Sequence, residues 1–167
     1  MAKGRAAGQW GPQIARSARL PTVIIRPGKP NKAASSFVSG LFREPLQGKD
    51  CTIPVPPDTP MASSGYRTVV QNIIHLHDLP SQKLMHDRAV GLPGMNLAVA
   101  EMVAAVESHA EATGKVHWEI DEFIHAICLG WPRALDCQRA HDLGFHQDGS
   151  LHEIIDGYLQ DFADIHA

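Results

Sequence analysis

The chain has 167 residues, of which 44% are hydrophobic and 20% charged, with a formal net charge of −3. This length allows one buried core, the weakly acidic balance argues against nucleic acid as a partner, and no apolar run approaches the roughly 18 residues that cross a bilayer. The basic N-terminus lacks the apolar stretch of a secretory signal, so we expect a cytoplasmic protein whose three cysteines are reduced thiols.

A predicted loose leader, residues 1–17, precedes the first strand and its polar loop. The apolar run Leu20–Ile25 (LPTVII) is typical of a buried parallel strand. Pro27, Gly28 and Lys29 then break the strand. Ligands of open α/β sheets bind beyond the carboxyl ends of strands, so this loop is a candidate site. The alternative is a connector that only turns the chain.

The next elements alternate between helix and strand patterns. The spacing of apolar residues and the positions of proline predict a helix over Ala33–Leu46 closed by Pro45, a short or edge strand over Cys51–Val55, a small-residue loop over Asp58–Gly65, a strand over Tyr66–Val70 and a helix over Gln71–Leu79.

The second half of the chain is richer in helix. The pattern predicts a strand over Arg88–Leu92, a helix over Leu97–His109 that runs on to Thr113 with Gly114 as its stop, a strand over Val116–Ile120, a helix over Asp121–Leu129 and a helix that Asp136 caps and that ends at Leu143. The last helix begins at Ser150, which stands with Glu153 in the spacing of a capping box.

Histidines near two helices raise the question of a metal site. His75 and Asp78 are helix neighbours, whereas His77 points about 200° away from His75. A second group lies near another helix end: His141, Asp142 and His146. Scattered surface histidines are the alternative, and we nominate no metal ligand.

A partial glycine motif and one arginine are further candidates. Gly91–Gly94 imitates part of a dinucleotide fingerprint, but Leu97 stands where that motif needs its third glycine. Arg67 stands at the start of a predicted strand, where its guanidinium suits bidentate binding of a carboxylate or phosphate. The alternative is a solvated arginine.

Several longer motifs together resemble a known family. They are LPTVIIRPGKPN from Leu20, SSF from Ser35, REPL from Arg43, VPPDT from Val55, NIIHLHDLP from Asn72, LPG from Leu92, AEMV from Ala100, WP from Trp131 and LGF from Leu143. From residue 18 onward the chain resembles the C-terminal half of extended short-chain dehydrogenase/reductases, also called the NAD-dependent epimerase/dehydratase family. The RPGKPN, SSF and REPL combination resembles the D-erythronate dehydrogenases of that family.

The resemblance implies an α/β fold with α+β-like character: residues 18–167 form the substrate-binding region of an extended Rossmann fold, with one or two strands of the parent parallel sheet. Family members bind NAD or NADP through an N-terminal glycine-rich βαβ unit and use a Tyr-x-x-x-Lys pair in catalysis. This sequence contains no such glycine-rich unit. It also has no Tyr-x-x-x-Lys pair, because Val70 stands at the lysine position after Tyr66 and Phe162 stands there after Tyr158. We therefore nominate no catalytic residue.

The resemblance also implies candidate binding residues. Pro27, Gly28 and Lys29 would lie near the nicotinamide of the cofactor. Four polar residues are available to a hydroxy-acid substrate: Asn31, Ser35, Ser36 and Arg67. Two departures from the family stand nearby, namely Ser-Ser-Gly-Tyr directly before Arg67 and Ala98 where a serine or threonine usually caps a helix.

The expected function is the substrate-binding portion of an NAD-dependent sugar-acid dehydrogenase that oxidises a 2-hydroxy acid to the 2-keto acid, inactive as an isolated chain. The first alternative is part of a nucleotide-sugar epimerase or dehydratase. The second is a non-catalytic remnant that recruits a partner. Without the rest of its sheet, the Thr22–Ile25 strand would keep an unpaired edge, so we expect an unstable chain, a homo-oligomer or dependence on a partner.

Overall fold

The computed structural model describes residues 15–29, 31 and 33–162, and most of the predicted leader, residues 1–14, lies outside them. The strands are β1 (Ser17–Arg19), β2 (Thr22–Ile24), β3 (Cys51–Ile53), β4 (Pro60–Gly65), β5 (Ala89–Gly91), β6 (Met95–Ala98) and β7 (Val116–Trp118). The helices are α1 (Ser36–Leu46), α2 (Tyr66–Asp78), α3 (Ser81–Leu84), α4 (Val99–Glu107), α5 (Glu122–Leu129), α6 (Gln138–Asp142) and α7 (Leu151–Asp161). In the described part of the chain no helix has the length and apolar character needed to cross a membrane.

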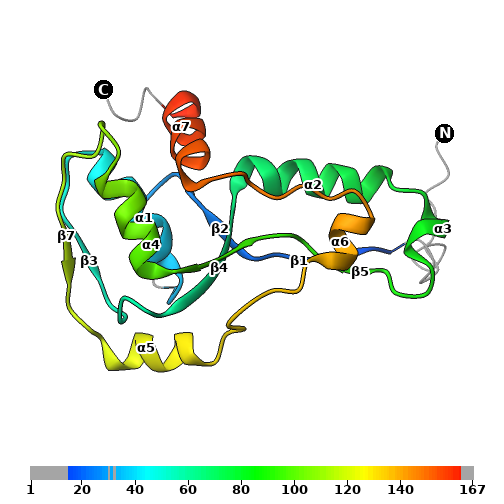
Figure 1. The fold of residues 1–167 in the computed structure, drawn as a ribbon, viewed down its shortest axis with the longest axis horizontal. Coiled ribbons are helices and arrows are strands. Elements are labelled where there is room, and N and C mark those ends of the chain that lie inside the picture. Colours follow the sequence, from blue (N-terminus) through cyan, green and yellow to red (C-terminus); the bar gives the residue numbers. More distant parts are fainter. Residues whose placement is uncertain (1–14, 30, 32, 163–167) are drawn as a thin grey trace, which may run out of the picture.

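The strands form three small sheets that are mostly parallel. β4 lies in the middle of a three-stranded sheet, parallel to β2 and antiparallel to β6. β1 pairs with β5, and β3 with β7, each in parallel. Figure 1 shows α2, α6, β1 and β5 towards one end of the molecule and α1, α4, β3 and β7 towards the other. The predicted α/β class, with its short stretch of parallel sheet, is confirmed.

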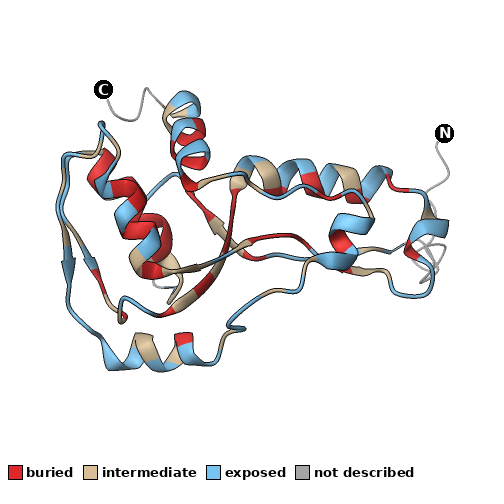
Figure 2. Ribbon diagram, viewed as in Figure 1, coloured by how far each residue is buried: buried red, intermediate tan, exposed pale blue. Residues whose placement is uncertain are grey.

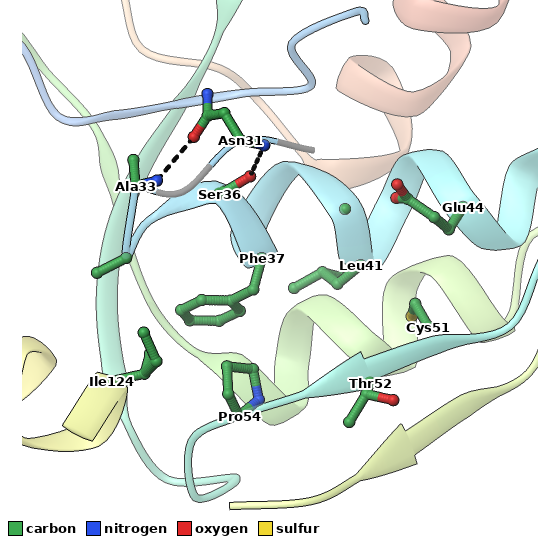
Figure 3. A pocket seen from close by; sticks show the side chains of 12 residues that line it. Asn31, Ala33, Ser36, Phe37, Leu41, Glu44, Cys51, Thr52, Pro54 and Ile124 are labelled. Atoms are coloured by element: carbon green, nitrogen blue, oxygen red, sulfur yellow. Dashed lines mark hydrogen bonds between the residues drawn. The ribbon is translucent and has the colours of Figure 1, made fainter. Parts of the chain in front are cut away.

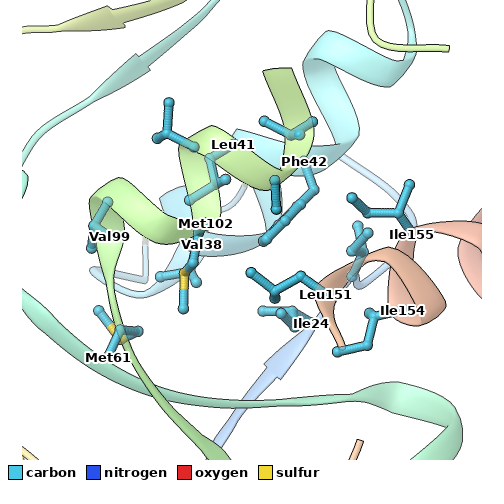
Figure 4. Close-up of a cluster of buried hydrophobic side chains, with 14 of the residues drawn as sticks. Ile24, Val38, Leu41, Phe42, Met61, Val99, Met102, Leu151, Ile154 and Ile155 are labelled. Carbon is cyan, nitrogen blue, oxygen red and sulfur yellow. The ribbon is translucent and has the colours of Figure 1, made fainter. Parts of the chain in front are cut away.

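The larger core lies where α1, α4 and α7 pack over β2 and β4. Figure 4 shows its side chains converging from these elements. Fully or almost fully buried members include Ile24, Phe42, Met61, Met102 and Ile155. Each contributes about 1.5–3 kcal/mol through burial. This cluster holds the end of β2 against α1 and so fixes where the following loop starts.

A smaller core lies under α2, beside the β1–β5 pair. Val69 and Leu76 of α2 pack there with Val90, Leu92 and Phe145. In Figure 2, α1 and α4 are largely red, whereas α2 is mostly pale blue, because only part of its circumference faces this cluster.

Two adjoining predictions around residue 65 are wrong. The expected loop Asp58–Gly65 is largely strand β4, and the expected strand Tyr66–Val70 is the start of α2. The small residues of β4 suggest a loop, but they suit a central strand that is buried between two neighbours. The start of α2 is held by Asp148, which lies far away in sequence and accepts from Gly65 N–H and Thr68 Oγ1, so no local signal marks it.

The predicted helix Leu97–His109 is shorter than expected, because Met95–Ala98 pairs with β4 as strand β6. The helix that follows, α4, ends at Glu107, well before the expected stop at Gly114. Ala98 is its N-cap and offers no side-chain cap, although the Glu101 carboxylate accepts a hydrogen bond from the Ala98 backbone N–H. Pro45 also lies inside α1 and does not close it.

The elements with strong local signals are confirmed. β3 and β7 form within their predicted ranges, and Asp121 caps α5 by accepting from two backbone N–H groups. Ser150 caps α7 as predicted, through Glu153 N–H. The return bond differs from a capping box, because the Glu153 carboxylate accepts from Gly149 N–H.

Gly114 allows the chain to cross close to Lys49, and this contact provides a test of the fold. A Cβ at Gly114 would lie 2.0 Å from the Lys49 carbonyl oxygen, whereas one at Gly91 would meet nothing within 4 Å. We expect Gly114→Ala to lower the free energy of unfolding by about 1–3 kcal/mol or more, because the obstructing atoms are backbone. Gly91→Ala should stay within about 1 kcal/mol of the parent. Urea unfolding of both variants measures this, and equal stabilities would contradict the crossing.

Candidate functional site

The loop after β2 lies at the carboxyl edge of the parallel β2–β4 pair. β2 and β4 run in register with Ile24 opposite Gly65, so both strands end at the same edge. The loop that begins at Arg26 and the start of α2 at Tyr66 therefore leave the sheet together. This is the edge at which open α/β sheets bind ligands, and it confirms the position expected for the loop.

A buried arginine fixes the start of this loop. Arg43 of α1 is only 5% exposed, and its Nη1 donates to the Arg26 carbonyl oxygen over 3.0 Å. Its Nη2 donates to Glu44 Oε1 at 2.7 Å, so the buried charge is paired. Arg26 N–H also donates to Ser39 Oγ, at 3.3 Å. α1 therefore holds the backbone on which the candidate cofactor residues stand.

Pro27, Gly28 and Lys29 are all exposed beyond this anchor. Gly28 has a φ of +98°, which L side chains rarely adopt, and a Cβ there would meet nothing within 4 Å. These three residues thus present open backbone at Gly28 and the exposed ammonium of Lys29. Their contact with a nicotinamide stays a prediction.

Asn31 and Ser36 hold the far end of the loop against α1. Asn31 N–H donates to Ser36 Oγ at 3.0 Å, and Ala33 N–H donates to Asn31 Oδ1 at 2.9 Å. Figure 3 shows both bonds at the mouth of a hollow of about 420 Å³. Because the Ser36 hydroxyl accepts in this bond, it can still donate its own proton. Ser35 is the N-cap residue of α1 and makes no side-chain cap bond.

The hollow itself is lined mainly by apolar groups of α1, β3 and α5. Phe37, Leu41, Pro54 and Ile124 form much of its wall (Figure 3). Cys51 is also on the wall, and burial, followed by the charges of Glu44 and Asp50, raises the pKa of its thiol to about 11. The thiol is therefore protonated at neutral pH and is a poor nucleophile. The hollow offers apolar surface with a polar rim at Asn31 and Ser36.

Arg67 lines a second hollow, of about 330 Å³, between the start of α2 and the segment before α7. Its guanidinium is already engaged: Nε donates to Asp161 Oδ2 at 2.8 Å and Nη2 to Oδ1 at 2.6 Å. The bidentate carboxylate contact expected from the sequence is therefore made within the chain. Arg67 lies in the first turn of a helix and not, as predicted, at a strand start.

Tyr66 completes this cluster. Its hydroxyl donates to Asp161 and also lies 3.2 Å from the Gly157 carbonyl oxygen. Burial and then the Asp161 carboxylate raise the pKa of Tyr66 to about 12. Hydrogen bonds from Arg67 and then Tyr66 lower the pKa of Asp161 to about 2. The three groups thus hold one another in fixed protonation states around neutral pH.

Asp148 is a polar residue that the sequence did not single out. Its Oδ2 accepts from Ser64 Oγ at 2.7 Å and from Gly65 N–H at 3.0 Å, and its Oδ1 accepts from Thr68 Oγ1 at 2.6 Å. A carboxylate near a helix N-terminus can accept from backbone N–H groups, and the helix dipole stabilises its negative charge. No local pattern could reveal it, because Asp148 lies 80 or more residues from these partners.

A buried amide fastens the same segment to α2. Asn72 is fully buried, and its Nδ2 donates to the His146 carbonyl oxygen at 2.8 Å. The His146 N–H donates back to Asn72 Oδ1 at 2.9 Å. The Asn72 side chain therefore pairs with backbone as a neighbouring strand does, and the 146–148 segment is tied to α2 at two points.

The structure does not gather all the predicted site residues in one place. Asn31 and Ser36 lie on one hollow and Arg67 on another, and the two hollows share no lining residue. The glycine motif is ruled out as a phosphate loop, because β6 and not a helix follows Gly94. His75 lies 2.9 Å from the Leu143 carbonyl oxygen, and within the described residues no group of three or more His, Cys, Asp or Glu is placed to hold a metal ion.

The Arg67–Asp161 pair predicts a specific pH dependence. The pKa of Asp161 is lower in the folded chain than its ordinary value near 4. The ion pair therefore stabilises the fold fully at pH values above about 4. This stabilisation is lost as the pH falls through about 2. We expect the stability difference between the parent and Asp161→Asn to shrink from pH 5 to pH 2 in urea unfolding. Tyr66→Phe, which keeps the ion pair, should retain most of this dependence; a parent–Asp161→Asn difference that is flat with pH would contradict it.

Comparison with known proteins gives close relatives for most of the chain. No family model matches it. It is 40% identical over 148 residues to the D-erythronate dehydrogenase of Cupriavidus necator, covering 87% of this chain and 46% of that protein. It is 41% identical over 144 residues to the D-erythronate dehydrogenase of Haemophilus influenzae, covering 85% and 46%. The chain therefore spans about half the length of the relatives it matches.

Solved structures agree with this relation. The nucleoside-diphosphate-sugar epimerase from Agrobacterium tumefaciens superposes with a TM-score of 0.83 at 35% identity, covering 89% of this chain and 44% of that one. The holo form of a GalE-like L-threonine dehydrogenase from Cupriavidus necator shares the fold, with a TM-score of 0.74 at 23% identity over 87% of this chain and 47% of that one. The chain is thus related to the D-erythronate dehydrogenases and has the fold of the C-terminal portion of extended short-chain dehydrogenase/reductases.

Proposed function

We propose that this chain provides the substrate-binding half of an NAD-dependent dehydrogenase that oxidises D-erythronate or a similar short 2-hydroxy acid to the 2-keto acid. The observation that carries this proposal is the 40% identity to a D-erythronate dehydrogenase along 87% of the chain. The match includes the loop after β2 and the start of α2, which leave the sheet at one edge.

The polar groups at this edge suit a small hydroxy acid. A guanidinium binds a carboxylate through two parallel hydrogen bonds, and Arg67 already does so with Asp161. The contact shows that the geometry of Arg67 accommodates a carboxylate. Asn31, Ser35 and Ser36 offer amide and hydroxyl groups that can bind hydroxyls. Asn31 and Ser36 line the other hollow, so they would contact a hydroxy acid bound there and not one bound at Arg67. In the proposed complex the substrate carboxylate replaces Asp161.

NAD, when bound, would accept the hydride from the substrate carbon. Pro27, Gly28 and Lys29 would contact the nicotinamide side of it, because their exposed backbone follows β2 directly and Gly28 leaves open space. Arg43 would keep that backbone in place through the Arg26 carbonyl. This half supplies contact with only one side of the cofactor.

The chain does not provide the general base for the reaction. Tyr66 has no lysine four residues later, and its hydroxyl, with a pKa of about 12, stays protonated at neutral pH. Tyr158 belongs to α7, and its side chain is completely buried in the larger core. We therefore propose that the isolated chain binds substrate without turning it over.

Two other functions have some support. Part of a nucleotide-sugar epimerase is favoured by the Agrobacterium tumefaciens epimerase, which has 35% identity and a TM-score of 0.83. A non-catalytic interaction module is favoured by the edges of β1 and β2 that have no strand partner among the described residues.

Ligand choice separates the three functions. We expect D-erythronate to raise the melting temperature of the chain and UDP-galactose to leave it unchanged. Protection by UDP-galactose alone would favour the epimerase, and protection by neither ligand the interaction module.

Arg67 gives the sharper test. We expect Arg67→Gln to weaken D-erythronate binding in calorimetry by about tenfold or more, because a charge-assisted hydrogen bond contributes about 1.5–3 kcal/mol. Arg139→Gln is the matched control, since Arg139 is also half-exposed and paired with a carboxylate, that of Asp87, but is remote from the site. Binding by the Arg139 variant should stay within about twofold of the parent. Equal losses in both variants would contradict a role for Arg67 in binding.

A further inference from the structure

We propose that the outer edge of β7 is a surface for self-association, at which β7 pairs antiparallel with β7 of a second copy of this chain. The inference is independent of the substrate proposed above. β7 consists of Val116–Trp118, and among the described residues it pairs with β3 alone. Figure 1 shows β7 at the far left margin of the molecule, with β3 on its inner side. The outer edge of the strand is therefore open to another chain.

The backbone groups of β7 and its flanks alternate in direction. The Lys115 carbonyl oxygen accepts from Cys51 N–H at 2.9 Å, and Glu119 N–H donates to the Ile53 carbonyl oxygen at 3.1 Å. Lys115 and Glu119 thus direct backbone groups to β3. Successive residues of a strand direct these groups to opposite sides. Val116 and Trp118 therefore present an N–H and a carbonyl each to the outer edge, where a further strand can bind them.

These two residues fix the register of a second strand. In an antiparallel ladder, the residues that exchange hydrogen bonds lie directly opposite each other. Val116 of each copy then lies opposite Trp118 of the other, and His117 meets its own copy on a twofold axis. Because both copies use the same surface, the contact is isologous and closes as a dimer.

The charges that flank β7 are self-complementary in this register. Lys115 and Glu119 are both exposed and stand two residues before and two residues after His117. Pairing about His117 sets each Lys115 opposite Glu119 of the other copy. Opposite charges directly across a ladder stabilise it, whereas like charges destabilise it. Charged side chains usually keep an edge strand from associating, but the order of these charges favours an antiparallel copy.

The neighbouring register is less favourable. A twofold axis at Trp118 would set Lys115 opposite Asp121. The Asp121 carboxylate is already engaged, because its Oδ1 accepts from Phe123 N–H at 2.9 Å and from Ile124 N–H at 3.1 Å at the start of α5. The axis at His117 uses only carboxylates that are free to pair across the interface, those of the two copies of Glu119.

The other face of β7 supplies apolar surface to the contact. In the ladder with β3, Val116 lies beside Cys51 and Trp118 beside Ile53. Ile53 is only 1% exposed, whereas Trp118 at the outer edge is 39% exposed. The second copy would bring its Val116 against this indole, and an aromatic residue opposite a β-branched one is a stabilising cross-strand pair. Pairing therefore covers apolar surface that the single chain leaves open.

The test follows the association of the full chain by sedimentation velocity over a series of concentrations, where we expect monomer and dimer. Lys115→Glu sets two carboxylates opposite each other at both ends of the ladder and should weaken the dimer by about tenfold or more. Adding Glu119→Lys restores the opposite charges and should return the affinity to within about threefold of the parent.

Lys83→Glu is the matched control for the charge change. Lys83 is also an exposed lysine, but it lies on α3, at the opposite end of the molecule from β7 (Figure 1). Its dimer affinity should stay within about twofold of the parent. Circular dichroism melts confirm that each variant folds.

A cysteine on the axis reports the register directly. In His117→Cys the two thiols face each other in a pair whose Cα atoms lie about 4.5 Å apart, a distance that a disulfide spans. Thr52→Cys is the control, because Thr52 lies beside His117 on β3 and its two copies are separated by three strand spacings, about 14 Å. Oxidation should give a covalent dimer of the His117 variant alone, with the parent as reference for the three native cysteines.

Several results would overturn the proposal. They are a monomer at every concentration, assemblies that grow beyond a dimer, equal affinities for the Lys115 and Lys83 variants, and a double variant that Glu119→Lys does not rescue. Covalent dimers of both cysteine variants, or of neither, would also contradict the pairing about His117.

The proposed function is tested separately. Protection of the chain by D-erythronate does not depend on β7, so its presence or absence leaves this proposal unaffected.

Discussion

The parallel pairing of β2 with β4 is the constraint on which the candidate site depends. Because Ile24 lies opposite Gly65, two polar connections separated by 40 residues leave the sheet at one edge. The first connection holds Gly28 and Asn31, and the second begins the helix that carries Arg67. A slip of one residue in this register would turn the side chains of β2 to the other face and break the contact of Ile24 with the core.

Two distant carboxylates organise the second connection. Asp148 accepts from the Gly65 N–H just before α2, and Asp161 pairs with Arg67 in the first turn of the helix. Both lie in the last 20 residues of the chain, so the C-terminal segment determines how this part of the site is presented. The pair with Asp161 is half-exposed, which makes its net contribution to stability small. Its larger effect is on binding, because an incoming carboxylate must compete with it.

The sequence predicted those elements whose signals are local. α5 and α7 begin at Asp121 and Ser150 because these side chains accept from backbone N–H groups two or three residues away. The site edge was also predictable, since Pro27 and Gly28 break a strand of β-branched residues. β4 and the start of α2 were missed because they depend on partners remote in sequence: β6 for the strand and Asp148 for the helix. For the same reason the sequence offered Arg67 only as a candidate for binding a carboxylate or phosphate and did not indicate its partner Asp161.

The reciprocal pair between Asn72 and His146 has a mechanical consequence. Together with the bonds from Asp148, it joins the middle and the beginning of α2 to one short segment of the chain. A helix held at two points cannot rotate independently of that segment. Any displacement of α2 is therefore transmitted as a rigid-body movement to residues 146–148 and to the walls of the hollow that contains Arg67.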